Sequence, residues 1–343
     1  MLVFRTKTTF IIGAGAGYEI EMPDPREMLA KIAQGFDFSR LGSELQTRDM
    51  VILGKHFEKF ARHLNTTPEK LQQAGGAIRQ AARVTGSIDA ILEQLGNDKL
   101  VQAAGKLAVV FYTLQAESRS PLGVEPRDPG DLPLRGNENW LYQLGRMLVA
   151  GVPRNKAEQC FDNLSIINFN YDRSLQHYLP WVIQMAFGMT LSEARQLVAA
   201  KLKMIYPLGN VGRLPWQNGE APDVEWGNEE PWNLHAVVSE INTISEMRSR
   251  PQMAQKILAE VAGGKRVVFL GFGFDPLHTS VLIDYSLSHD PDLLVSLTGM
   301  AEAPREAVMR TLTRLTGVDE SLISMQDVRP FQLLRDYSLF LES

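Results

Sequence analysis

The sequence predicts an α/β protein with a Rossmann-like, doubly wound parallel sheet and an embedded helical subdomain. Two observations support this fold class. In the second half of the chain, short apolar runs rich in β-branched or aromatic residues alternate with helical stretches, as parallel strands joined by helices require. Near the N-terminus, the apolar run 8–12 ends in alternating glycines, which is typical of a buried strand that leads into a phosphate-binding turn.

Length and composition define the organisation. A chain of 343 residues exceeds the usual single core, so its length indicates either one large domain with an embedded subdomain or two domains. The expected domain covers residues 1–343, with a Rossmann core of about 1–26 and 160–343 and a helical insertion of about 27–159. The apolar fraction of 44% is that of a globular protein, and the net charge of −5 does not favour nucleic acid as a partner.

The insertion is predicted to be helical over about residues 27–117. Thr67 followed by Pro68 is typical of a helix start, with a capping hydroxyl and a proline in the first turn. The next stretch, 117–139, is so rich in proline and glycine that we expect an ordered loop or a linker. The helices of this region are expected at 55–64, 70–84, 87–95, 100–116 and 140–150.

Strands and helices then alternate to the C-terminus. A second capping pattern, Thr190 with Glu193, opens one of these helices. Residues 209–232 have little periodicity and three tryptophans; we interpret them as a long loop pinned to the core, with a ligand lid or partner surface as the alternative. Strands are expected at 164–169, 204–206, 267–272 and 293–297, and helices at 175–187, 190–203, 234–261 with a break near Pro251, and 331–341.

Cysteine and histidine usage restricts the chemistry. The single cysteine, Cys160, cannot form a disulfide within the chain or supply a four-thiolate zinc site, and the six histidines are dispersed. We therefore expect no metal and a reducing compartment. The acidic residues that follow the glycine run argue against a secretory signal, and no apolar run approaches membrane-spanning length. The expected location is the cytoplasm, without a membrane partner.

Four predicted strand ends carry residues suited to ligand binding, because ligands of open α/β sheets bind at the carboxyl edge of the strands. The glycine turn 13–17 is a weak signal alone, since Tyr18 breaks the six-residue dinucleotide fingerprint and a simple tight turn is the alternative. Asn170 and Asp172 follow the strand at 164–169, and an Asx turn that caps the next helix is the alternative for Asp172.

The other two strand ends are 206–209 and 271–273. Gly271 and Gly273 permit a close approach of the backbone to a ligand. Two glycine-bearing strand ends together with an Asn/Asp pair fit a dinucleotide that lies across the sheet better than any one of them does.

In combination, the turn 13–17, the motif Pro23-Asp24-x-Arg26 and the motif Asn170-x-Asp172 resemble the NAD-binding motifs of the sirtuin superfamily. The chain is also similar, over nearly its whole length, to bacterial sirtuin-like proteins that lack the zinc module, several of which hydrolyse NAD in antiphage defence.

The resemblance implies a role for each motif. The turn would cradle the pyrophosphate, Asp24 and Arg26 would lie over the nicotinamide ribose and the phosphates, and Gly271 and Gly273 would face the adenosine ribose. Asn170 would hold a ribose hydroxyl or the attacking water, and Asp172 the nicotinamide carboxamide. The implied ligand-binding residues are Gly13, Ala14, Gly15, Ala16, Gly17, Pro23, Asp24, Arg26, Gly209, Gly271 and Gly273, and the candidate catalytic residues are Asn170, Asp172 and Tyr206.

The sequence also departs from the family pattern. The histidine of the family's His-Gly segment is absent, because Leu208 precedes Gly209 and Tyr206 stands two residues before Leu208. A tyrosine with an ordinary pKa of about 10 is a poor base at neutral pH. Gly17 replaces the serine that closes the first turn. These departures weaken the expectation of turnover more than the expectation of binding.

The expected function is therefore NAD binding, with hydrolysis that releases nicotinamide, in an antiviral defence effector. The alternative is a binding module for NAD or ADP-ribose that has lost catalysis and acts through assembly. Zinc-dependent protein deacetylation is disfavoured because the cysteines of the zinc module are missing. The expected partners are NAD or ADP-ribose, further copies of the chain, or a partner protein of a defence system.

Overall fold

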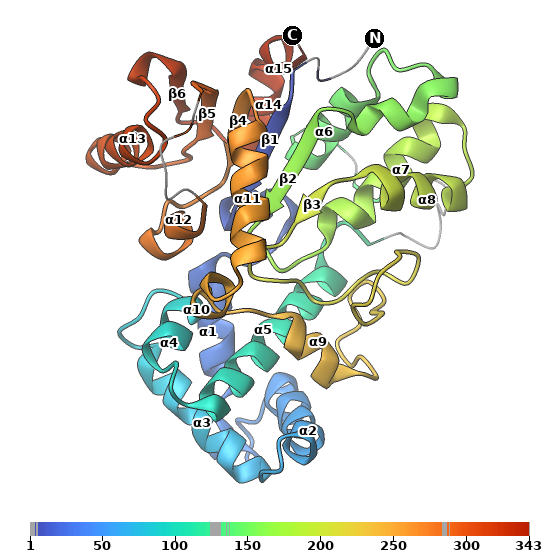
Figure 1. Cartoon of the computed structure of the whole chain (residues 1–343). Coiled ribbons are helices and arrows are strands. Elements are labelled where there is room, and N and C mark those ends of the chain that lie inside the picture. The colour runs from blue at the N-terminus through green and yellow to red at the C-terminus, as the bar shows by residue number, and fades with distance from the viewer. Residues whose placement is uncertain are drawn as a thin grey trace.

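A single parallel sheet organises the protein (Figure 1). The computed structural model describes residues 4–342, apart from 5, 124–131, 135, 137, 283–286 and 288. Within these residues six parallel strands form one sheet in the order β3-β2-β1-β4-β5-β6. This is the order of the dinucleotide-binding doubly wound fold, and it confirms the predicted fold class. The strands are β1 (Thr8–Ile12), β2 (Leu164–Asn168), β3 (Met204–Ile205), β4 (Arg266–Leu270), β5 (Asp292–Ser296) and β6 (Ile323–Gln326).

The predictions of β1 to β5 are confirmed to within two residues at each end. The sequence did not predict β6, the edge strand that pairs with β5. Its residues Ile-Ser-Met-Gln alternate in polarity over only four positions, and three of them are half-buried. A strand this short and this exposed lacks the continuous apolar run that marks the central strands.

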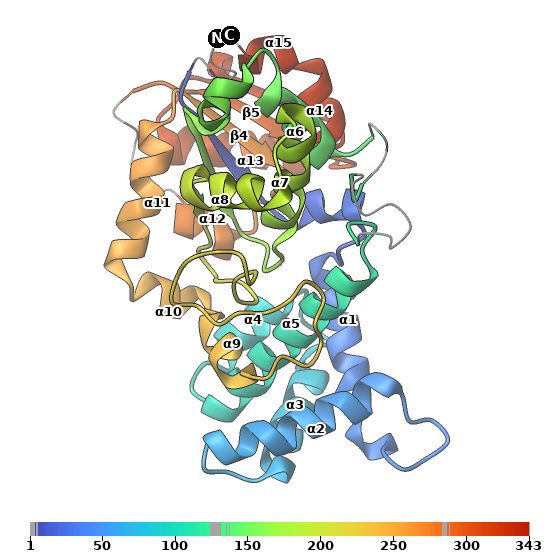
Figure 2. The same cartoon turned by 90° about the vertical axis from the view of Figure 1, so that its right-hand side faces the viewer.

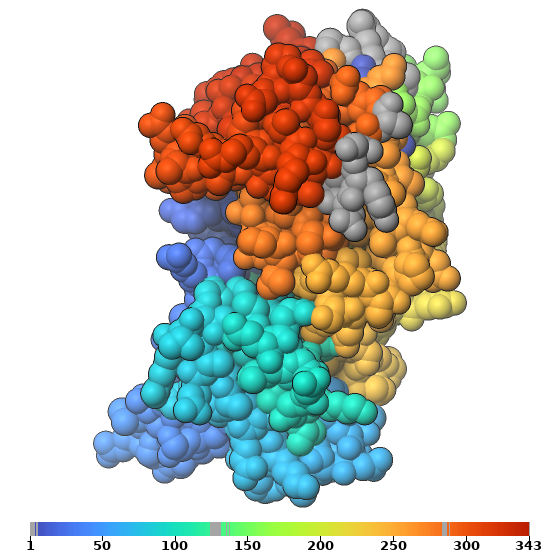
Figure 3. All heavy atoms as spheres, turned by 60° about the vertical axis from the view of Figure 1, so that its left-hand side comes forward, coloured from blue at the N-terminus to red at the C-terminus, as the bar shows by residue number. Residues whose placement is uncertain are grey.

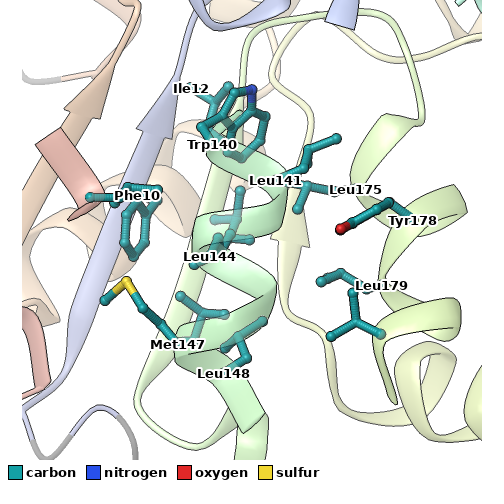
Figure 4. Close-up of a cluster of buried hydrophobic side chains, with 14 of the residues drawn as sticks. Phe10, Ile12, Trp140, Leu141, Leu144, Met147, Leu148, Leu175, Tyr178 and Leu179 are labelled. Carbon is teal, nitrogen blue, oxygen red and sulfur yellow. The ribbon is translucent and has the colours of Figure 1, made fainter. Parts of the chain in front are cut away.

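Helices cover both faces of the sheet. Alternate side chains of β1 divide between the two faces, with Phe10 and Ile12 in one core cluster and Ile11 in the other. Figure 4 shows the side chains of α6 between β1 and α7, with Met147 beside Phe10. The first face carries α6 (Trp140–Val149), α7 (Ser174–Phe187), α8 (Leu191–Lys201), α14 (Pro330–Asp336) and α15 (Ser338–Glu342), and the second carries α10 (Ile244–Arg248), α11 (Pro251–Gly263), α12 (Pro276–Leu282) and α13 (Glu302–Thr316).

A helical lobe with its own core lies at one end of the sheet (Figures 1 and 2). In Figure 3 it forms the blue-to-cyan mass below the orange-to-red half. The lobe contains α1 (Pro25–Gly35), α2 (Arg48–His63), α3 (Pro68–Ala81), α4 (Ile88–Gln94) and α5 (Lys99–Arg119), joined by α9 (Leu234–Glu240). The helix α6 also lies in the range 27–159 expected for the insertion, yet its apolar side chains pack on the sheet.

Several helix boundaries differ from the prediction. The range 234–261 contains α9, α10 and α11; the break at Pro251 is confirmed, and a second break precedes α10, which Thr243 and Glu246 open with a capping box. The range 331–341 is divided between α14 and α15 at Tyr337. The sequence did not predict α12 and α13. Residues 117–119 of the expected loop 117–139 belong to α5, and residues 124–131, 135 and 137 lie outside the described residues.

Two predicted helix starts are confirmed. The Thr67 hydroxyl accepts the backbone N–H of Lys70 at 3.4 Å, with Pro68 at the start of α3. Thr190 and Glu193 form the capping box of α8. Each such cap contributes about 1 kcal/mol to the free energy of unfolding. No helix in the described part of the chain combines the length and the apolar character needed to cross a membrane.

The segment 209–232 is a long loop, as predicted. Val211 and Val224 are buried in the core of the helical lobe. Trp216 and Trp226 pack against the core on the sheet, whereas Trp232 is 85% exposed. Two of the three tryptophans therefore pin the loop, which contacts both halves of the molecule.

The carboxyl group of Glu19 joins the turn after β1 to two helices. Glu19 lies in the 3-10 helix η1 (Ala14–Ile20). Its oxygens accept the backbone N–H groups of Trp140 at 2.7 Å and Phe331 at 3.1 Å, at the starts of α6 and α14. Burial raises the pKa of Glu19 to about 7, although both backbone donors and Arg329 act to lower it.

We expect Glu19→Gln to change the pH dependence of stability. Between pH 4.5 and about 7 the folded protein binds a proton at Glu19 that the unfolded chain has released, so the free energy of unfolding falls as pH rises through this window. Because the carboxyl is partly open to solvent, Glu19→Gln should remove about 2 kcal/mol of this fall. Urea unfolding at both ends of the window measures the difference. The exposed control Glu44→Gln should retain the wild-type slope, and the same slope in Glu19→Gln would contradict the assignment.

Candidate functional site

A cavity of about 690 Å³ opens at the carboxyl ends of β1 and β4, where the strand order reverses. Open α/β sheets bind their ligands at this position. The cavity wall comes from segments that are distant in sequence: the turns after β1 and β4, the starts of α1 and α4, and the ends of β2 and β5. Sheet and helical lobe thus both contribute to it, and its volume is in the range of small-molecule sites.

Most of the predicted site residues meet in this cavity. Ala16 is buried below the turn and does not line it. Tyr206 and Gly209 line a different depression, beside the edge strand β3. The predicted site residues that line the cavity are Gly13, Ala14, Gly15, Gly17, Pro23, Asp24, Arg26, Asn170, Asp172, Gly271 and Gly273.

The two glycine turns pack directly against each other. The N–H of Gly13 donates to the carbonyl of Leu270 at 3.0 Å, and the N–H of Gly15 donates to the carbonyl of Gly271 at 2.9 Å. A Cβ on Gly13 would lie 2.7 Å from the Gly271 oxygen, and one on Gly271, which has φ +58°, would lie 2.0 Å from the nitrogen of Ala16. The glycines therefore serve a contact between backbones, and the N–H groups of Gly13 and Gly15 are not free to bind a phosphate.

The helix α1 begins at the rim of the cavity. Asp24 caps this helix, because its carboxylate accepts the backbone N–H groups of Arg26 and Glu27, both at 2.8 Å. In turn, the Glu27 carboxylate accepts the backbone N–H of Asp24 at 3.2 Å. Pro25 follows as the first helical residue. Arg26 is the one lysine or arginine among the described residues that line the cavity. The guanidinium of Arg26 favours an anion at this rim, whereas the backbone N–H groups of Arg26 and Glu27 are already bonded to the Asp24 carboxylate.

The polar segment after β2 forms the opposite wall. The side-chain amide of Asn170 donates to the carbonyl of Gly13 at 3.2 Å and so joins the ends of β2 and β1. Asp172 accepts the N–H of Ser174 at 3.0 Å and also the Ser174 hydroxyl, which is the Asx turn that we considered as its alternative role, although the N-cap position of α7 is Arg173. Burial raises the pKa of Asp172.

Tyr206 is not placed to act in the cavity. Its hydroxyl donates to Gln176 Oε1 at 2.7 Å and lies 3.2 Å from the carbonyl oxygen of Asp172. Burial raises the pKa of Tyr206 above its ordinary value, so the phenol stays protonated. A base for chemistry in the cavity must come from another residue.

The structure adds cavity residues that the sequence had not indicated. Tyr171 donates its hydroxyl to Asp89 Oδ1 at 2.7 Å, which joins the segment after β2 to α4 of the helical lobe. His278, on α12, also lines the cavity. Ser296 is the last residue of β5, and Thr298 directly follows the strand predicted at 293–297. The same reasoning by strand ends therefore applies to Thr298.

A buried ion pair holds the segment after β2 in place. Arg173 and Glu117 are both fully buried, and Glu117 Oε1 accepts the backbone N–H and the Nε–H of Arg173, each at 3.0 Å. The guanidinium also donates to the carbonyls of Val224 at 2.6 Å and Glu225 at 3.2 Å. The N–H of Gly227 donates to Glu117 at 3.2 Å. This network ties together α5, the start of α7 and the loop 209–232.

Comparison of the chain with models of protein families, with curated protein sequences and with solved structures gave no match. In the described part of the chain, no group of three or more His, Cys, Asp or Glu side chains is arranged to hold a metal ion. The geometry of the site is therefore the evidence on its chemistry.

We expect Gly271→Ala and Gly273→Ala to behave differently, although they lie two residues apart. Gly271→Ala should lower the free energy of unfolding by about 3 kcal/mol, because it combines a left-handed φ with a clash against the turn after β1. A Cβ on Gly273 would meet nothing within 4 Å, so Gly273→Ala should stay within about 0.5 kcal/mol of wild type. Chemical denaturation measures both, and equal stability of the two variants would contradict the packing of the two turns.

We expect Glu117→Gln to lower the free energy of unfolding by about 3–5 kcal/mol, because it leaves the buried Arg173 charge uncompensated. Glu306→Gln is the matched control, since it breaks the exposed pair between Glu306 and Arg310 and should change stability by at most about 0.5 kcal/mol. Denaturant titration of both variants gives the comparison. A small effect of Glu117→Gln would mean that the pair does not hold the segment after β2.

Proposed function

We propose that the protein binds NAD in this cavity and hydrolyses the bond between nicotinamide and ribose, as a NADase of the bacterial sirtuin-like type. One observation carries the proposal. The motifs at 13–17, 23–26 and 170–172, which resemble NAD-binding motifs, line a single cavity together with the glycines at 271–273, at the point where the strand order reverses. Parallel strands bring their carboxyl ends to one edge of a sheet, so the segments that directly follow β1, β2 and β4 meet there in any such fold. The segment 23–26, at the start of α1, does not directly follow a strand, and its place in the same cavity is the added support.

The charges around the cavity suggest how the dinucleotide lies. The diphosphate would sit at the rim formed by Arg26 and the start of α1, since a charge-assisted contact there contributes about 1.5–3 kcal/mol. The nicotinamide ribose would lie toward Asn170, and the adenosine toward Gly273 and the end of β5. This arrangement differs from the cradle expected from the turn alone, because the N–H groups of Gly13 and Gly15 are already bonded.

Hydrolysis at this site would depend on the positioning of the substrate and on a nearby base more than on a strong nucleophile of the protein. Water adds to C1′ of the ribose while the C1′–N bond breaks, nicotinamide leaves as a neutral molecule, and one proton is released. Positive charge develops on the ribose in the transition state. The carboxylates of Asp89 and Asp275 line the cavity and favour such a charge. Asn170, held by the Gly13 carbonyl, would orient the ribose or the water.

A second candidate function is a binding module that recognises NAD or ADP-ribose without cleaving it. The position of Tyr206 outside the cavity favours this candidate, because it removes the base that the sequence offered in place of the missing histidine. In either case we propose a cytoplasmic defence effector that acts with further copies of the chain or with a partner protein.

Asn170→Ala tests the hydrolytic function. We expect the wild-type protein to bind ADP-ribose in calorimetry and to release nicotinamide from NAD, measured by chromatography. Loss of a positioned amide should reduce release about 10²-fold or more. Asn97→Ala, an exposed asparagine in the turn before α5, should retain the wild-type rate.

The outcomes separate the two candidates. Unchanged release by Asn170→Ala would show that Asn170 is not the catalytic residue. Binding of ADP-ribose by the wild type without release of nicotinamide would contradict the hydrolase and support the binding module. Absence of binding would contradict both.

A further inference from the structure

Hydrolysis of NAD releases a proton from the attacking water, so a group that lines the cavity should accept it. Three of the carboxylates there already accept hydrogen bonds at the starts of helices. Asp24 accepts two N–H groups of α1, and Asp172 accepts the N–H and hydroxyl of Ser174. Asp275 accepts the N–H of Leu277 at 2.8 Å at the start of α12. Each of these carboxylates holds local structure.

The other ionisable groups are also engaged or unsuited. Asp89 accepts the Tyr171 hydroxyl at 2.7 Å. Burial raises the pKa of Tyr171 well above its ordinary value, so its phenol acts as a donor. Arg26 is a cation and has no lone pair to accept a proton.

His278 is the group that remains. Its side chain is 21% exposed and lines the cavity. Its Nε2 lies 3.7 Å from Asp89 Oδ2 and its Nδ1 lies 3.8 Å from Asp275 Oδ1, so both contacts exceed hydrogen-bond length. The ring packs edge-on against Phe169, with centroids 5.7 Å apart, and Phe169 directly precedes Asn170. The imidazole therefore lies beside the segment 170–172, and neither of its two carboxylate contacts is a hydrogen bond that holds a helix or a turn.

We propose that His278 is the general base of the reaction; this inference rests on the proposed NAD hydrolysis. The neutral imidazole accepts a proton from water as the water oxygen bonds to C1′ and the electron pair of the C1′–N bond leaves with nicotinamide. The imidazolium then gives its proton to solvent, which restores the enzyme. The carboxylates of Asp89 and Asp275, 3.7 Å and 3.8 Å from the ring nitrogens, stabilise the positive charge of the imidazolium in between.

The surroundings of His278 suit this role. Asp89 comes from α4 and Asp275 from the start of α12, so negative groups face the ring from both lobes. On the side of α10, the cation Arg248 is bonded to the Ser280 hydroxyl. The helix α11 contributes Ile257 and Val261 to the core cluster that also holds Val281 and Leu282 of α12. The base thus comes from α12, the helix that follows β4, on the opposite side of β1 from the segment 206–209 in which the sequence lacks a histidine.

The test uses His278→Gln and His278→Ala in the full chain. We expect kcat for nicotinamide release to fall about 10²–10⁴-fold in both variants, because a positioned base contributes this much. The Kd for ADP-ribose should stay near the wild-type value, and added imidazole should restore part of the activity of His278→Ala but not of His278→Gln. His235→Gln, an exposed histidine on α9 that stacks on His63 away from the cavity, should match the wild type.

Each outcome has a separate meaning. If the wild type releases nicotinamide and His278→Gln releases it equally fast, the base is wrong and the hydrolase stands. If His278→Gln loses affinity for ADP-ribose as much as it loses rate, His278 binds the ligand and is not the base. If the wild type binds ADP-ribose but releases no nicotinamide, the hydrolase fails and the base assignment fails with it. Rescue by imidazole shows that the variant is folded.

Discussion

The buried ion pair between Arg173 and Glu117 is the constraint on which the site depends. It lies where three parts of the chain meet: the longest helix of the lobe, the polar segment after β2 and the long loop 209–232. Burying both charges is unfavourable unless their hydrogen bonds are satisfied, and here the guanidinium and the carboxylate each have several partners. The pair thereby fixes Asn170 and Asp172 relative to the helical lobe.

The cavity has a rigid floor and a wall that bridges the two lobes. Its floor is the contact between the turns after β1 and β4, where backbone meets backbone and a side chain on Gly13 or Gly271 would clash. On the far side, the bond between Tyr171 and Asp89 connects the sheet to α4. A ligand in this cavity touches both lobes, so its affinity depends on contacts that neither lobe forms alone. The anion-binding potential lies at Arg26 and the start of α1 rather than in the glycine turn.

The sequence predicted the fold class and most of the residues that line the cavity. Apolar runs mark the central strands, and polar or glycine residues mark the ends of those strands. Its limits have physical causes. Residue 278 lies on a helix of seven residues, too short for periodicity to reveal it. The partners Glu117 and Arg173 are far apart in sequence, and no local pattern indicates their contact. Tyr206 follows a strand of two residues at the sheet edge, and its hydroxyl bonds to α7 instead of entering the cavity.

We propose that one cavity at the switch point of the sheet holds NAD across the two lobes. An experimental structure with bound ADP-ribose is the decisive measurement. The diphosphate should lie beside Arg26 at the start of α1, one ribose beside Asn170 and His278, and the adenosine toward the end of β5. Ligand found instead in the depression beside β3, where Tyr206 and Gly209 lie, would rule out this binding mode.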